Sequence, residues 1–543
     1  MHKVLRGRLA CMFFCVSALG AGPVHAIDTF IPCSGDAGGN LVSVFAAASL
    51  YTGANTLTLE PGCTYTVSGN SAVAAPDASP TVFQPLLQGT IPFSGPVAII
   101  IIGNGATIAR NPATGPARFF YVGPTATLVL VSLTLKDGIS RGQNGGDSQD
   151  DGTPGTGGTW SGLGGAVMND GTLTADTVTF EGNQAIGGNG GGSASAGAPG
   201  GGGAGMGGAI FSRGALTVVR SSLIANGATG GANGAVRGCS GCQSAGGGGG
   251  GLGGTGGGPA TGAGGFGGAG GGAAIGGTGG NGGFGGGGGG GANQGAAGEF
   301  GGNAGIGGFG GGGGAALGGA IFIEAVSAGG AQIVNSTFSA NGTHGGATHT
   351  GGDGGSAAGG AIFLHAGQLS VDYATLVGGA AGGGNAISPG NPQSGGNAWG
   401  AGIYVHAGAT LLLGHSIIHG DVVTPGTSDV GGSGLASDPD AFGVLSSGGY
   451  NLVHIRGASS GWVVSDLPDG TDPLLGPLKN NRGTTLTFLP LAASPAIDAG
   501  MIPPGDCPAV DQRGQSRPWG STCDIGAVEV DDTLFRDGFE PTY

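Results

Sequence analysis

The chain has 543 residues, of which 137 are glycine, and it carries 16 Lys and Arg residues against 31 Asp and Glu. Glycine is far more frequent than in ordinary globular proteins, yet the proline content and strict three-residue period of collagen are missing, which excludes a collagen-like triple helix. The acidic balance argues against nucleic acid or an anionic membrane surface as a partner.

The first 26 residues have the pattern of a secretory signal peptide. Lys3, Arg6 and Arg8 precede an apolar run, and the segment ends at Ala26. The run is too short to span a bilayer, and no later stretch has about 18 uninterrupted apolar residues. Without this leader, 13 basic residues remain against 31 acidic ones, a net charge of −18. We therefore expect a secreted chain, extracellular or on the outer cell surface, with no membrane span after cleavage.

A short repeat dominates the centre of the chain. The pentapeptide GGAIF begins at Gly207, Gly318 and Gly359, with looser copies at Gly164 and Gly400. Each copy precedes short runs of β-branched and aromatic residues that are too small to bury a face alone. Such units must stack on their copies, which predicts an all-β, right-handed parallel β-helix. The glycine pair would form the turn before a strand, where positive φ or close backbone contact excludes a Cβ.

Alternation assigns two faces to the strand after each glycine pair. Isoleucines are expected inside the solenoid, at Ile210, Ile321, Ile362 and Ile403. Aromatic and titratable residues then face outward, and the candidate ligand stripe consists of Phe322, Phe363, Tyr404, His365 and His406. One hypothesis is a structural ladder covered by glycine loops. The other is a metal-binding or carbohydrate-binding stripe, since stacked rings offer flat faces to sugars.

The repeat spacing leaves the number of coils open. Ala320, Ala361 and Gly402 are 41 residues apart, so each period holds either two coils or one coil with an excursion of about 20 residues. The longest glycine-rich insert, 227–317, is either a solvated disordered loop or a bundle of polyproline-II strands, because that helix has three residues per turn. Asparagines are expected at a later turn, where Asn tolerates positive φ and its amide bonds the backbone; they are Asn183, Asn226 and Asn341.

Six cysteines remain after the leader, in a compartment that favours disulfides. The positions of the cysteines favour disulfides between Cys33 and Cys63 and between Cys507 and Cys523. A disulfide between Cys239 and Cys242 could close a small loop.

An acidic loop follows the first predicted coils. It contains Asp147, Asp150 and Asp151. The loop is either a solvated acidic turn or a weak Ca²⁺-binding site. We predict no cofactor, no catalytic residue and no other metal site.

Two resemblances accompany these patterns. The GGA[ILV] and FxxN motifs, the latter at Phe180–Asn183 and Phe338–Asn341, resemble the repeats of polymorphic outer membrane proteins and related bacterial surface β-helix proteins. The segments GGYNLV, SPAIDAG, DQRGQSRP and CDIGAVE resemble the C-terminal module called choice-of-anchor Q, found in secreted or surface bacterial β-helix proteins. The predicted organisation is a signal peptide, an N-terminal cap, a solenoid, this module and a short tail, at 1–26, 27–89, 90–445, 446–530 and 531–543.

These patterns favour a non-catalytic role in adhesion or contact with extracellular matrix, with a polysaccharide or a host or matrix protein as partner. The alternative is a carbohydrate-active lyase or hydrolase, or a carbohydrate-binding β-helix. Asp498 and Asp511, with Arg513 and Arg517, are expected to form buried salt bridges rather than a catalytic site. The fold alone implies no reaction.

Overall fold

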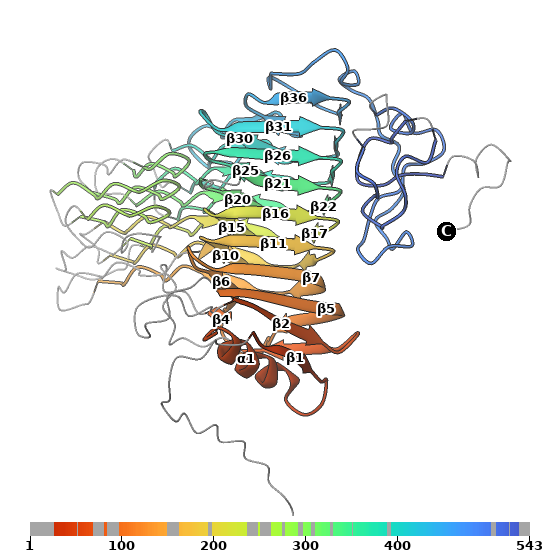
Figure 1. Ribbon diagram of the computed structural model, residues 1–543. Helices are drawn as coiled ribbons and strands as arrows, with labels where there is room; N and C mark the ends of the chain where they lie inside the picture. Colours follow the sequence, from red (N-terminus) through yellow and green to blue (C-terminus); the bar gives the residue numbers. More distant parts are fainter. Residues whose placement is uncertain are drawn as a thin grey trace, which may run out of the picture.

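The computed structural model shows a stack of parallel strands with a glycine-rich lobe on one side and an irregular C-terminal region on another (Figure 1). It describes residues 26–51, 53–68, 81–83, 97–148, 162–193, 198–235, 248–249, 262–273, 277–291, 297–305, 310–325, 330–349, 351–387, 393–500, 507–520 and 522–531. The predicted signal peptide, apart from Ala26, lies outside these residues.

The strands form four parallel sheets. The largest sheet contains β1 (Asp28–Ile31), β2 (Gly53–Leu59), β3 (Thr64–Val67), β5 (Val97–Arg110), β7 (Thr127–Lys136), β11 (Thr172–Asp176), β12 (Thr179–Glu181), β16 (Ala215–Val219), β17 (Ser222–Ile224), β21 (Ala331–Val334), β22 (Thr337–Ser339), β26 (Gln368–Asp372), β27 (Thr375–Val377), β31 (Thr410–Gly414), β32 (Ile417–His419), β36 (Ser446–Gly449) and β37 (Leu452–Val453).

The second sheet, which carries the GGAIF strands, contains β4 (Thr81–Phe83), β6 (Arg118–Val122), β10 (Val167–Asn169), β15 (Ile210–Ser212), β20 (Ile321–Ile323), β25 (Ile362–Leu364), β30 (Ile403–Val405) and β35 (Ala441–Phe442). The third contains β8 (Ile139–Arg141), β13 (Gln184–Ile186), β18 (Gly227–Thr229), β23 (Gly342–His344), β28 (Ala380–Gly382) and β33 (Val422–Thr424). The fourth contains β9 (Gly162–Leu163), β14 (Gly205–Met206), β19 (Ala316–Leu317), β24 (Ala357–Ala358), β29 (Ala398–Trp399) and β34 (Ala436–Ser437).

One coil contributes a strand to each sheet in turn, and two consecutive strands to the largest. Equivalent strands pair in register with the coils on either side, so that Ile210 pairs with both Val167 and Ile321. Ile321 pairs in turn with Ile362, which settles the open question of the 41-residue period: each period is one coil and one excursion. The pairing of Ile210 with Ile321 also shows that the insert between them adds no further coil to this sheet. The protein is therefore a parallel β-helix, as the repeats predicted.

The predicted inward and outward faces are confirmed. Ile210, Ile321, Ile362 and Ile403 belong to the main apolar core inside the solenoid, whereas the aromatic residues that follow them belong to a second cluster outside it. The predicted glycine corner is also present: Gly318 has a φ of 65°, and a Cβ on Gly319 would lie 2.0 Å from the carbonyl oxygen of Gly360 in the next coil.

The asparagine side chains make the predicted hydrogen bonds, but the asparagines do not have the positive φ that was expected. The residues with positive φ are those just before, Ala225 and Ala340. Asn226 donates through Nδ2 to Oδ1 of Asn341 at 3.0 Å and to the Phe180 carbonyl at 3.0 Å. Asn183 is linked to Asn226 in the same way, at 2.9 Å. These side chains form a buried ladder that satisfies the polar backbone between coils.

A helix covers the N-terminal end of the solenoid. Helix α1 (Ala37–Ala48) begins at Asp36, whose carboxylate accepts from the Gly39 amide at 2.9 Å, and it buries Leu41 and Phe45 over the first strands (Figure 1). The predicted disulfide Cys33–Cys63 ties the segment before the helix to the turn before β3. Within the described residues, no helix is long and apolar enough to cross a membrane.

The excursions assemble into one lobe, which we call the glycine bundle. It comprises the described residues of 142–148, 187–204, 230–235, 248–315, 345–356, 383–397 and 425–435. Every third residue donates to the next strand: Gly187, Gly190 and Ser193 bond the carbonyls of Thr229, Ala232 and Ala235 at 2.8–3.0 Å. A three-residue period is that of the polyproline-II helix rather than of a β-strand.

Outgoing and returning segments alternate across the bundle. Gly231 donates to Gly203, Gly314 to Gly231, Gly346 to Gly314 and Gly355 to Gly346, at 2.7–2.9 Å. The insert joins the same lattice through Gly270, which donates to Gly287, and Gly287, which donates to Gly202, both at 2.9 Å. For the described parts of 227–317, these bonds support the bundled polyproline-II interpretation over a disordered loop.

The C-terminal region lies along the side of the solenoid rather than across its end (Figure 1). Strands β36 and β37 pair with β31 and β32, so the solenoid continues past residue 445, where the sequence placed its end. The irregular chain that follows docks on the outer face of β17 and β22. Gln512 accepts from the Thr337 hydroxyl at 2.6 Å and donates to the Ser222 hydroxyl at 3.0 Å.

The packing of the glycine bundle predicts that substitution by alanine affects stability very differently at two of its glycines. A Cβ on Gly355 would sit 1.9 Å from the Gly314 carbonyl oxygen, whereas a Cβ on Gly432 would meet nothing within 4 Å. We expect Gly355→Ala to lower the free energy of unfolding by about 1–3 kcal/mol because the strands must separate. Gly432→Ala should leave it unchanged within about 0.5 kcal/mol. Denaturant unfolding followed by circular dichroism measures both, and equal effects would contradict the close-packed lattice.

Candidate functional site

The outward aromatic residues form a continuous ladder. Parallel pairing in register places Phe211 over Phe322, Phe322 over Phe363, and Phe363 over Tyr404, with ring centroids 5.3, 5.1 and 4.7 Å apart and interplanar angles of 3–7°. Phe442 continues the stack 4.8 Å beyond Tyr404. The predicted stacking of these aromatic residues is therefore present. Whether glycine loops cover the stacked rings or leave them open to a ligand depends on the insert.

The glycine-rich insert covers this ladder. Phe266, Phe284 and Phe300 project from the insert and meet the stacked rings edge-on, with centroids 5.4–6.4 Å apart. Phe322 and Phe363 are fully buried, and Tyr404 is 8% exposed. Burial, with a smaller effect of Glu299, raises the pKa of Tyr404 to about 12. The structure thus places the proposed stripe in a second apolar core, where these rings present no open face to a sugar.

The two predicted histidines lie beside the same core. The rings of His365 and His406 stack 5.1 Å apart, and His365 packs 4.2 Å from the Phe284 ring. Burial, together with His406, lowers the pKa of His365. His406 lies 3.6 Å from the Glu299 carboxylate on the insert. These contacts hold the insert on the solenoid. Among the described residues, no group of three or more His, Cys, Asp or Glu side chains could hold a metal ion.

Of the candidate residues in the acidic loop and the Cys239–Cys242 pair, the structure describes only Asp147. Asp147 accepts a hydrogen bond from the Gly192 amide at 2.7 Å, which links neighbouring excursions. The rest of the possible Ca²⁺ loop, Asp150 and Asp151, and the possible pair Cys239 and Cys242, lie outside the described residues.

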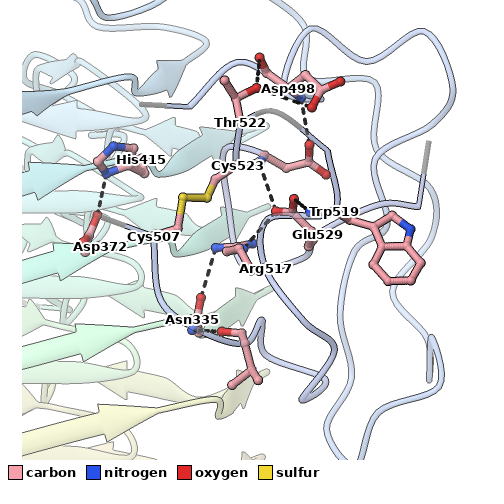
Figure 2. Close-up of a disulfide and its surroundings, with 12 residues drawn as sticks. Asn335, Asp372, His415, Asp498, Cys507, Arg517, Trp519, Thr522, Cys523 and Glu529 are labelled. Atoms are coloured by element: carbon pink, nitrogen blue, oxygen red, sulfur yellow. Dashed lines mark hydrogen bonds and ion pairs between the residues drawn. A yellow bond between two sulfur atoms is a disulfide. The ribbon is translucent and has the colours of Figure 1, made fainter. Parts of the chain in front are cut away.

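The expected buried salt bridges are present only in part: Asp511, Arg513 and Arg517 form ion pairs, whereas Asp498 is exposed and forms none among the described residues. Arg513 pairs with Asp511 at 2.8 Å. Arg517 pairs instead with Glu529 at 3.0 Å (Figure 2). Figure 2 also shows the predicted disulfide Cys507–Cys523 beside this network. Arg517 reaches the solenoid as well: it donates to Asn335 at 3.2 Å and lies 4.5 Å above the centre of the Tyr373 ring.

Asp498 takes a different part in the same region. Its amide donates to the Asp524 carboxylate at 2.8 Å, and its carbonyl accepts from the Thr522 hydroxyl at 2.8 Å (Figure 2). Burial, together with Glu529, raises the pKa of Asp524 to about 7. Because Asp524 and Glu529 are buried and hold backbone amides, this carboxyl pair fixes the fold of the C-terminal region.

A second buried carboxyl pair interrupts the asparagine ladder. Asp421 follows Ile418 by three residues, as Asn341 follows Phe338, and it accepts from the Gly379 amide as the ladder asparagines accept from theirs. Its second oxygen is buried and has no hydrogen-bond partner among the described residues. Burial, then Asp440, raises the pKa of Asp421 well above its usual value, and burial raises that of Asp440 to about 6. This pair was not predicted from the sequence, although Asp421 lies three residues after Ile418, the spacing of the FxxN repeat.

An open groove lies at one edge of the glycine bundle, and we call it the polar groove. Its volume is about 280 Å³. Four successive segments line it, with Gly301, Gly302, Asn303, Asp353, Gly354, Ser356, Ser394, Gly395, Gly396, Asn397, Ser433, Gly434 and Leu435. Asp353 accepts from the Ser394 amide at 2.8 Å and from Asn303 Nδ2 at 3.2 Å, and Asn397 accepts from the Leu435 amide at 2.7 Å. These bonds fix the groove walls.

The fold and these surfaces define a parallel β-helix protein with a glycine-rich lobe. Comparison with protein-family models, with curated proteins and with solved structures finds no match for this chain. No family model supports the resemblance to surface β-helix repeats or to choice-of-anchor Q modules.

The Asp421 carboxyl predicts a pH-dependent contribution to stability. A carboxyl group whose pKa is raised by folding stabilises the fold fully below its unfolded pKa, near 3.8, and loses that contribution as the pH rises through its folded pKa. We expect Asp421→Asn, which restores the ladder amide, to raise the free energy of unfolding at pH 8, by about 1.4 kcal/mol for each unit of pKa elevation. The gain should shrink towards pH 4.

The measurement is urea unfolding of both proteins between pH 4 and pH 8. Asp28→Asn is the matched control, because Asp28 is exposed on β1. A stability difference between Asp421→Asn and the original chain that is independent of pH would contradict a carboxyl group that is protonated in the folded protein.

Proposed function

We propose that this chain is a secreted or surface-exposed β-helix protein without catalytic activity, which makes adhesive contacts with extracellular polysaccharide or matrix protein. The observation that carries the proposal is the glycine bundle. Its backbone lattice holds several excursions in one fixed arrangement, and its edge bears a polar groove. An extended rigid surface suits several weak contacts whose affinities combine.

The positions of the carboxyl groups support a non-catalytic role. Glycoside hydrolysis needs two carboxyl groups facing one bond, about 5 to 9.5 Å apart. Two close pairs among the described residues, Asp421–Asp440 and Asp524–Glu529, are buried and serve backbone amides. A further pair, Asp170 and Glu324, holds Arg213 between its two carboxylates. A substrate would not reach either buried pair without unfolding the coil or the C-terminal region around it.

Two further observations support an extracellular location. Cys33–Cys63 and Cys507–Cys523 form disulfides, which persist in oxidising compartments. The leader pattern in residues 1–26 and the resemblance to choice-of-anchor Q modules agree with export. We propose on the same ground that the segment after residue 454 serves attachment or orientation at the surface, since it lies on one side of the solenoid and leaves the glycine bundle uncovered (Figure 1).

The test is retention of the purified mature chain on immobilised polysaccharides and matrix proteins, measured by surface plasmon resonance. We expect retention on at least one class of surface, and stronger retention on dense than on sparse coatings because several contacts act together. No retention on any surface would contradict the adhesive role.

The rival enzymatic hypothesis needs a separate assay. Polysaccharides incubated with the chain would be followed for new reducing ends and for unsaturated products, with Asp150→Asn as the variant. We expect no turnover. Turnover that Asp150→Asn abolishes would replace the adhesive proposal with a carbohydrate-active enzyme.

A further inference from the structure

We propose that the polar groove is a binding site for a neutral glycan; this inference rests on the proposed contact function and names the ligand class for it. The groove walls come from segments around Gly302, Gly354, Gly395 and Gly434. These segments stack in the bundle, because Gly354 donates to Ser394 at 3.0 Å and Gly395 to Gly432 at 3.1 Å. The groove therefore crosses several strands, and a bound chain would run across them.

The groove offers hydrogen-bonding groups that the fold does not use. Within the described residues, the hydroxyls of Ser394 and Ser433 and the amide nitrogen of Asn397 make no hydrogen bond, although Asn397 Oδ1 is held by the Leu435 amide. The free groups therefore project from anchored backbone at fixed positions. Hydroxyl and amide groups donate and accept hydrogen bonds, which matches the hydroxyl groups of a sugar.

The glycines of the groove pack against neighbouring strands and leave its surface to the residues between them. A Cβ on Gly302 would lie 2.0 Å from the Asp353 carbonyl oxygen, and one on Gly434 would lie 2.0 Å from the Gly396 carbonyl oxygen. A ring lying in the groove meets the polar side chains of the walls at its edges and the apolar side chain of Leu435, which is 71% exposed, at the side. Glycan rings have both polar edges and apolar faces, and this surface provides a partner for each.

Charge restricts the class of glycan. The described residues that line the groove include no Lys or Arg, and Asp353 is the single charged residue among them. Asp353 is half-buried, with its two oxygens held by Ser394 and Asn303. An acidic glycan would place a second carboxylate near it without a compensating cation, which is unfavourable. The groove therefore favours neutral sugars over uronates.

The orientation of the groove disfavours a peptide strand as ligand. A polyproline-II peptide that extended the bundle would lie parallel to its strands and bond the backbone at every third residue, as the strands do among themselves. The groove instead runs across four segments and presents side-chain groups. A peptide ligand is therefore an alternative outcome of the experiment.

The experiment compares the mature chain with Ser394→Ala/Ser433→Ala on an array of neutral glucans, mannans and galactans, with polygalacturonate and immobilised matrix proteins alongside. Both changed hydroxyls are exposed and make no hydrogen bond within the described part of the chain, so we expect the variant to fold. The control variant is Thr172→Ala/Thr410→Ala, which removes two exposed hydroxyls from the largest sheet. Circular dichroism verifies all three proteins.

The expected result is binding to a neutral glycan that weakens about tenfold in the groove variant, from the loss of two hydrogen bonds, and is unchanged in the control. Asp353→Asn should admit polygalacturonate, since Asn keeps an acceptor for the Ser394 amide while its charge is gone. Glycan binding that the groove variant retains would overturn this inference and leave the contact function standing. Binding only to matrix proteins would do the same, whereas no binding at all would overturn both.

Discussion

The structure depends on the close approach of backbone to backbone in the glycine bundle. Carbonyl oxygens occupy the space where Cβ atoms would stand, as at Gly355, where a Cβ would lie 1.9 Å from a neighbouring oxygen. The hydrogen bonds that result are individually modest, but each fixes a strand that has almost no apolar surface to bury. The glycine content is therefore required by the lattice. In the solenoid, by contrast, apolar burial dominates, and glycine is required at corners such as Gly318, where φ is positive.

The aromatic ladder joins these two kinds of structure. On its inner side, the sheet of β15, β20, β25 and β30 buries isoleucines in the solenoid, and on its outer side it buries aromatic rings under the insert. Three phenylalanines of the insert supply the apolar contacts that its glycines lack. A segment whose composition suggests disorder thus gains order from a few rings placed over an existing surface and from backbone bonds to strands already in position.

Periodic features of the fold were predictable, and contacts between different excursions were not. Ile210 and its equivalents, the corner glycines and two disulfides followed from spacing. The burial of Phe363 did not, because its partners Phe284 and Phe300 come from a segment with no periodic relation to the ladder. The polar groove was not predicted for the same reason. Asn303 and Asn397 are distant in sequence, and only the hydrogen-bonded lattice of the bundle brings them to the same groove. Asp421 was recognisable in principle, since it occupies the position of Asn341 in a later coil.

The ladder contact between Asn226 and Asn341 spans 115 residues, whereas that between Asn183 and Asn226 spans 43. A solenoid ordinarily grows by adding each coil to its neighbour, so folding spreads along short-range contacts. At this junction the next coil arrives only after the whole insert has been synthesised, and closing the larger loop costs additional entropy. Among the ladder contacts named here, the junction between the chain before Ile224 and the chain after Leu317 therefore closes the largest loop, and it carries the highest entropic cost of joining two coils.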